Sequence, residues 1–123
     1  MQQVQYINGN LIGTLSAAVS IKGDTTVRDG AMWFDIEPTL QDPLTIKAQI
    51  KDEGYSAANG QYILYPTVMQ SKDGNVEMAF SITSSTTNPS AAYAVVGDQT
   101  QTQGKNTSTI YVATTGDAPY NEV

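Results

Sequence analysis

One tryptophan and two acidic residues share a face of an expected strand, and they are the best-placed residues in the chain for chemistry. Trp33, Asp35 and Glu37 alternate along the segment 30–37. Because an extended chain repeats every two residues, the two carboxyls would lie about 7 Å apart, a separation that glycosidases can use. The structural alternative has Trp33 packed against a neighbouring sheet, with the acids solvated near the strand end. The trio is therefore a candidate ligand-binding site with a competing structural explanation.

The absence of histidine and cysteine from the sequence removes most other active-site chemistry. It excludes a Ser-His-Asp triad, a Cys-His pair and an HExxH zinc site. The scattered aspartates do not follow a calcium-loop pattern, and turns account for them better. We therefore expect no metal site and no cofactor, and a protein that is not an enzyme.

Charge and length limit the partners that the chain can have. Its 123 residues fit a single module, and twelve Asp and Glu against six Lys and Arg give a net charge of −6. This charge repels nucleic acid and anionic membranes. There is no apolar run long enough to cross a bilayer, so membrane insertion is not expected. Abundant Thr, Ser, Asn and Gln favour an extracellular or surface-associated protein.

Apolar and polar residues alternate with a period of two in several short segments, which predicts half-buried strands. A helix would scatter these residues around its circumference. Further strands are expected over 30–36, 91–96 and 109–114, for a total of about seven. The predicted apolar faces are Val76, Met78, Phe80 and Ile82 in 75–83; Leu44, Ile46, Ala48 and Ile50 in 44–51; and Leu11, Leu15, Val19 and Ile21 in 10–21.

The segment from Tyr62 to Met69 differs because both of its faces are apolar. This pattern predicts an inner strand that is covered on each side. Proline cannot donate to a central ladder, so Pro66 should lie at the start of this strand or at a bulge.

Turn residues separate the predicted strands. Asp73-Gly74 predicts a type I′ hairpin, because that turn needs positive φ at both central residues. The polar stretch from Gly97 to Ser108 is predicted to be a loop. Further turns are expected at Asn8-Gly9, Gly23-Asp24, Asp29-Gly30, Asp42-Pro43, Asn59-Gly60 and Asn88-Pro89.

Several of these motifs together resemble a blade of large secreted or surface-associated β-propeller-like proteins. The resemblance implies an all-β fold of antiparallel sheets, with an incomplete first blade-like sheet at 10–55 and a second at 60–115 in one module, 1–123; a β-sandwich is the alternative. None of the motifs is catalytic. They are Tyr65-Pro66, Asp73-Gly74-Asn75, Phe80-Ser81 and Asn88 to Tyr93, with Ala31 to Pro38 and Gly116 to Pro119 similar to the flanking parts.

A chain with about two blades would leave apolar faces uncovered, because a closed propeller needs about four to eight. We therefore expect a homo-oligomer, or association with the rest of a larger propeller. Association would close into a ring or continue as a filament. The function expected is a non-catalytic module for ligand binding or self-assembly. The alternatives are a carbohydrate-active propeller fragment and a structural subunit of a fibre or virion.

A glycan is a possible partner on separate grounds. Tyr55, Tyr62, Tyr65 and Tyr93 could stack against sugar rings. Tyrosine is also favoured in strands for packing alone, so the structural explanation competes here as well.

Overall fold

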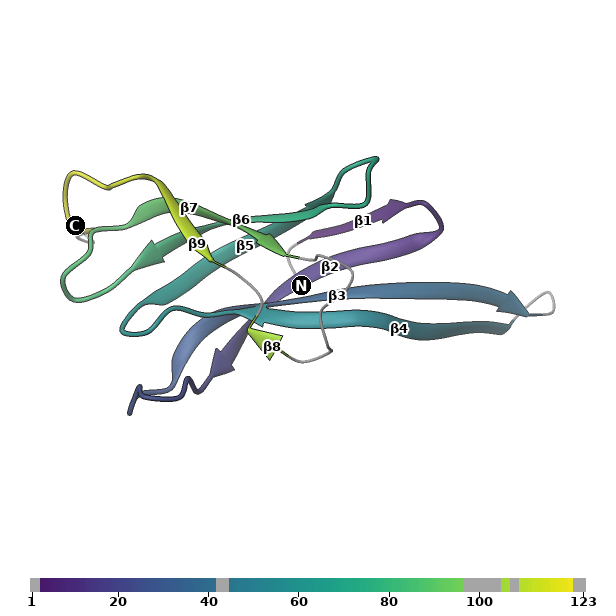
Figure 1. Ribbon diagram of the computed structural model, residues 1–123, viewed down its shortest axis with the longest axis horizontal. Coiled ribbons are helices and arrows are strands. Elements are labelled where there is room, and N and C mark those ends of the chain that lie inside the picture. The colour runs from purple at the N-terminus through teal and green to yellow at the C-terminus, as the bar shows by residue number, and fades with distance from the viewer. Residues whose placement is uncertain (1–2, 42–44, 97–104, 107–108, 121–123) are drawn as a thin grey trace.

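The structure of the protein, a computed structural model, describes residues 3–41, 45–96, 105–106 and 109–120. These residues form nine strands in two sheets (Figure 1). The first sheet has the order β1-β2-β3-β4-β8, and the second has the order β5-β6-β7-β9. The strands are β1 (Gln3–Ile7), β2 (Asn10–Val19), β3 (Arg28–Gln41), β4 (Thr45–Ser56), β5 (Tyr62–Gln70), β6 (Val76–Thr83), β7 (Ser90–Val96), β8 (Lys105–Asn106) and β9 (Ile110–Thr114).

The two sheets share one core, because β5 of the second sheet lies against β1, β2 and β3 of the first. Every residue predicted to face the core from β6 is buried, which confirms the alternation in that segment. This arrangement confirms an all-β fold of antiparallel sheets, and it is compatible with both blade-like sheets and a sandwich. The core contains Ile12, Ala31 and Trp33 of the first sheet, and Ile63, Val68, Val76, Met78, Phe80, Ile82, Ala92 and Ala94 of the second.

Two hairpins show how turn chemistry sets the strand connections. β1 and β2 are joined by Asn8-Gly9, where φ is 52° and 88°, the two positive values that a type I′ turn requires. The predicted hairpin at Asp73-Gly74 joins β5 and β6, but its predicted turn type is wrong. Of these two residues only Gly74 has a positive φ, and its N–H donates to the Ser71 carbonyl at 3.0 Å. The loop is longer than two residues, so a single left-handed glycine closes it.

The prediction that β5 is covered on both faces is wrong. β5 is an edge strand, and its burial alternates, with Val68 buried and Tyr65 71% exposed. Apolar side chains on both faces indicate what a strand can bury and do not show what covers it. The predicted bulge is confirmed by a register shift between Leu64 and Thr67 that contains Pro66.

The face predicted for the β2 segment is not the face that meets the core. Ile12 and Thr14, on the opposite face, are fully buried against the second sheet, and the Thr14 hydroxyl donates to the Met32 carbonyl at 2.8 Å. Leu11 and Leu15 are only half-buried on the outer side. The inner face combines Ile12 with the polar Thr14, whereas the outer face is the more apolar one, so alternation alone indicates the wrong face.

Two other expectations are corrected at the strand boundaries. Asp29-Gly30 is no turn, because β3 begins at Arg28 and pairs through both residues with β2. A Cβ on Gly30 would lie 2.9 Å from the Ser56 carbonyl oxygen, so the glycine permits close strand packing. Within the predicted loop 97–108, the short strand β8 pairs in parallel with Gly54 and Tyr55 of β4. The remainder of that loop, and Asp42-Pro43, lie outside the described residues.

Candidate assembly surface

The predicted trio on β3 is placed in two different environments. Trp33 is 2% exposed and lies in the core between the sheets. Asp35 is half-buried, and its Oδ1 has no hydrogen-bond partner among the described residues. Glu37 forms an ion pair with Lys51 of β4 at 2.7 Å. The structure therefore does not present these three side chains as one open site.

The electrostatics of the two acids also differ. Burial raises the pKa of Asp35, and Asp52 lies directly opposite on β4. The Glu37 carboxylate raises the pKa of Lys51 by hydrogen bonding to it. The charge of Glu37 is thus compensated at the surface, whereas Asp35 lies within the sheet beside a like charge. A catalytic pair would need both carboxyls to reach one substrate.

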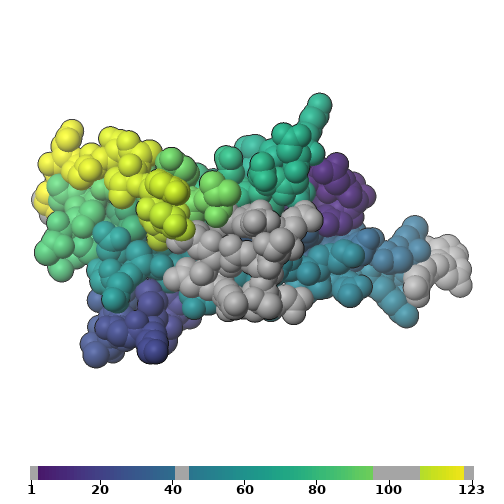
Figure 2. Space-filling view, viewed as in Figure 1, coloured from purple at the N-terminus to yellow at the C-terminus, as the bar shows by residue number. Residues whose placement is uncertain are grey.

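The most unusual feature of the surface is a two-stranded arm formed by the far ends of β3 and β4, residues 36–41 and 45–50. β2 pairs with β3 only as far as Ile36, so beyond that point β3 and β4 pair with each other. Figure 1 shows this ribbon extending away from the other strands, and Figure 2 shows it projecting from the body of the molecule. The arm begins at the register shift between Asp35 and Ile36.

The arm has one apolar and one polar face, which follow from its register. Directly opposite residues in an antiparallel pair share a face. The polar face carries Glu37, Thr39, Lys47 and Gln49. The opposite face, here called the apolar arm face, consists of the pairs Ile36 with Ile50, Pro38 with Ala48 and Leu40 with Ile46.

The apolar arm face is open to solvent. Leu40 is 73% exposed, Ile46 is 70% exposed and Ile50 is 50% exposed. The sequence predicted this side of β4 to be half-buried, and that expectation is wrong. Alternation predicts that the apolar side of a strand packs against other residues. A two-stranded ribbon by itself offers no third strand or second sheet that could bury that side.

The apolar arm face continues onto the outer face of the first sheet. In register, Tyr6 of β1 lies beside Leu11 of β2, which lies beside Ile36 of β3. One row further from the arm, Phe34 lies over Gly13, where an added Cβ would be 2.5 Å from the ring. The face predicted for β2 from its alternation therefore belongs to this outer surface. The whole surface runs from β1 across the sheet to the end of the arm.

The second sheet carries a separate apolar area on its own outer face. The Tyr93 and Tyr111 rings stack there with centroids 5.2 Å apart. Val95 and Met69 are exposed in the neighbouring row, on either side of Glu77. Exposed apolar patches that extend over several strands mark interaction sites more often than scattered residues do.

Comparison of this chain with models of protein families, with characterised proteins and with solved structures found no match. The resemblance to β-propeller blades therefore stays a prediction. In the described part of the chain, no helix is long and apolar enough to span a membrane. The same residues contain no group of three or more acids that could hold a metal ion.

Proposed function

We propose that this protein is a non-catalytic, extracellular or surface-associated β-module that works by association with copies of itself. The observation that carries the proposal is the apolar arm face, where Leu40 and Ile46 lie opposite each other and are each about seven-tenths exposed. An isolated two-stranded ribbon is at best marginally stable in water. Covering this face would both stabilise the arm and remove its apolar area from solvent.

The charge distribution favours a second copy as the cover. The segment 36–51 contains two acids and two lysines and is neutral overall, while the rest of the chain carries the entire net charge of −6. Contact through the arms therefore brings together the least repulsive parts of two acidic molecules. Two arms packed face to face would bury the same residues on each copy, as an isologous interface requires.

A fibre or virion subunit is the second candidate, and the apolar area around Tyr93 and Tyr111 favours it. If the arm of one copy covers this area on the next copy, the contact joins two different surfaces. Such a head-to-tail contact produces a ring or an open filament. Imaging by negative-stain electron microscopy would separate closed particles from regular polymers.

Sedimentation equilibrium of the intact chain and of an arm-shortened variant tests the proposal. In the variant, residues 38–48 are replaced by Asn-Gly, which joins the paired residues Glu37 and Gln49 by a short hairpin turn. We expect the intact chain to form dimers or larger species and the shortened chain to be monomeric. An intact chain that stays monomeric at its solubility limit would refute self-association.

A further inference from the structure

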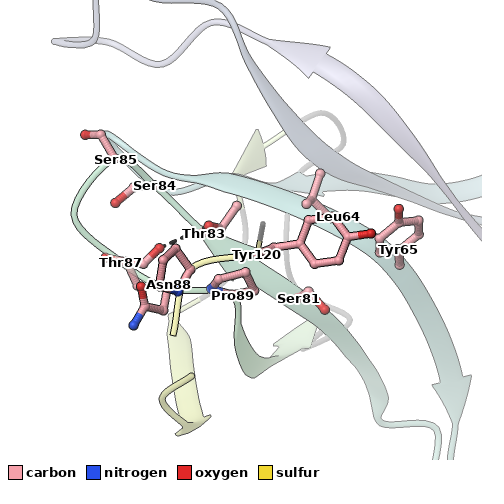
Figure 3. A pocket seen from close by; sticks show the side chains of 11 residues that line it. Leu64, Tyr65, Ser81, Thr83, Ser84, Ser85, Thr87, Asn88, Pro89 and Tyr120 are labelled. Atoms are coloured by element: carbon pink, nitrogen blue, oxygen red, sulfur yellow. Dashed lines mark hydrogen bonds between the residues drawn. The ribbon is translucent and has the colours of Figure 1, made fainter. Parts of the chain in front are cut away.

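The second sheet has a cleft at the end opposite the β5–β6 hairpin turn. Its volume is about 550 Å³, within the range of about 300–1,000 Å³ typical of small-molecule sites. β5 and β6 form its floor, and the segments 84–89 and 119–120 form its walls. Figure 3 shows Tyr65 at one end of the cleft, Ser85 at the other and the Tyr120 ring between them. The cleft shares no residue with the arm.

Two tyrosines supply an aromatic surface in this cleft. Tyr65 is 71% exposed and Tyr120 is 78% exposed, so neither ring is used to fill the core. Tyr65 also has a φ of 53° at the bulge before Pro66, a left-handed conformation that is unfavourable for a bulky residue. Strained residues of this kind cluster at binding sites, where the surrounding structure holds them in place.

The opposite end of the cleft is a network of hydroxyl groups. The Thr83 hydroxyl donates to the Thr87 carbonyl at 3.0 Å, and the Thr86 N–H donates to the Ser84 hydroxyl at 3.1 Å. These bonds fix the turn between β6 and β7 before any ligand arrives. A fixed wall lowers the entropy cost of binding.

The chain beyond β9 is anchored to the same turn, and this anchoring brings Tyr120 to the cleft. The Asn88 side-chain amide donates to the Gly116 carbonyl at 3.0 Å, and the Gly116 N–H donates to the Ser90 hydroxyl at 3.1 Å. A Cβ at Gly116 would lie 2.0 Å from the Pro89 carbonyl oxygen, so only glycine fits there. The hydroxyl end of the cleft and the segment that carries Tyr120 are thus both held by hydrogen bonds between side chains and the backbone.

The geometry points to a binding site for a neutral carbohydrate, such as a short oligosaccharide. Exposed tyrosine rings offer flat apolar faces to the C–H faces of sugar rings. Serine, threonine and asparagine side chains can donate to and accept from sugar hydroxyls. Among the described residues that line the cleft there is no Asp, Glu, Lys or Arg, so these residues offer a charged ligand no ion-pair partner.

Titration of the ¹⁵N-labelled chain, followed by NMR, tests the inference with named probes. The neutral probes are cellotriose, maltotriose, xylotriose and tri-N-acetylchitotriose. Trigalacturonic acid and tetramethylammonium chloride test an anion and a cation, since two tyrosines could also form a cation–π cage. We expect at least one neutral trisaccharide to give saturable shifts in the cleft residues 81–89, with no saturable shifts from the charged probes.

Two cleft variants and one matched control locate the site. Tyr120→Ala and Tyr65→Asn should each weaken the affinity for the bound sugar about tenfold. Asparagine tolerates the left-handed conformation, so Tyr65→Asn should fold at least as stably as the parent chain. Tyr93→Ala removes an equally aromatic side chain outside the cleft and should leave sugar binding unchanged.

Three outcomes would overturn the carbohydrate site. These are saturable binding of tetramethylammonium or trigalacturonic acid at the cleft, no saturable binding of any neutral probe, and sugar binding that survives both cleft variants. The self-association proposal is tested on the arm and the carbohydrate site on the cleft. Failure of one proposal is therefore distinguishable from failure of the other. Repeating the titration with the arm-shortened variant would show sugar binding without self-association.

Discussion

The pair formed by Leu40 and Ile46 offers the sharpest test of the assembly surface. Both residues lie at the far end of the apolar arm face and are 73% and 70% exposed. We consider Leu40→Thr combined with Ile46→Thr, because threonine keeps a high strand propensity while it removes most of the apolar side chain. In the isolated chain such surface changes alter the free energy of unfolding by no more than about 0.5 kcal/mol.

The expected effect on association follows from the exposed fraction. Complete burial of a Leu or Ile side chain contributes about 1.5–3 kcal/mol. About seven-tenths of each side chain remains to be buried, and threonine retains one methyl group. The double variant should therefore lose about 2–3 kcal/mol of association free energy per chain. This corresponds to about a 30- to 140-fold weaker association, since 1.4 kcal/mol is tenfold. An isologous dimer carries the change twice, which squares the factor to about 10³-fold or more.

Sedimentation equilibrium measures this change, and circular dichroism checks that the sheets are retained. The matched control is Lys47→Thr with Gln49→Thr, two substitutions to the same residue on the polar face of the same arm. The control should associate like the parent chain. Equal weakening by both double variants, or no weakening by either, would show that the apolar arm face is not the contact surface.

Three further predictions concern other parts of the fold. Gly116→Ala should lower the free energy of unfolding in urea by about 1–3 kcal/mol, because the new methyl meets the Pro89 carbonyl oxygen; an unchanged midpoint would contradict this close contact. Arg28 lowers the pKa of Asp24, so this carboxylate stabilises the fold above the unfolded pKa of about 3.9, and the stabilisation is lost as the pH falls further. Asp24→Asn should therefore make the thermal midpoint fall less steeply as the pH is lowered. Parallel curves of midpoint against pH for the parent chain and the variant would exclude this role. Burial raises the pKa of Asp35, so its ionised form is destabilising and Asp35→Asn should raise the thermal midpoint at neutral pH; a lower midpoint would contradict the assignment.

Seven of the nine strands were predictable from local pattern, whereas β1 and β8 were not predicted. The alternation over Val76–Thr83 reflects a strand with the core on one side, and the structure places it there. The bulge at Pro66 was also predictable, because proline removes a ladder donor wherever it stands. The Asn8-Gly9 hairpin carried the same kind of signal, since both residues tolerate positive φ.

What covers each strand was not predictable from the same pattern. The β2 segment is more apolar on the face of Leu11, yet the position of β5 makes Ile12 the inner residue. Likewise, the pattern of β4 is that of a half-buried strand, although nothing in the described chain covers Ile46. Burial depends on contacts between segments distant in sequence, which alternation does not encode.

The cleft was only partly predictable. Tyr65 was among the tyrosines expected to offer a stacking surface, but no local pattern predicted that Tyr120 would line the same cleft. That placement depends on the fit of Gly116 against the turn at Pro89, a contact between distant segments. The predicted acid pair on β3 does not form an open site. Glu37 instead forms an ion pair with Lys51 of the neighbouring strand.

The short strand β8 has a consequence for how the molecule unfolds. Between β7 and β9, both in the second sheet, the chain crosses over to pair Lys105 and Asn106 with β4 of the first. The backbone therefore passes between the two sheets twice more, in addition to the direct connection from β4 to β5. Neither sheet can unfold separately without breaking the pairing of β8 with β4. Denaturation should therefore follow a single all-or-none transition.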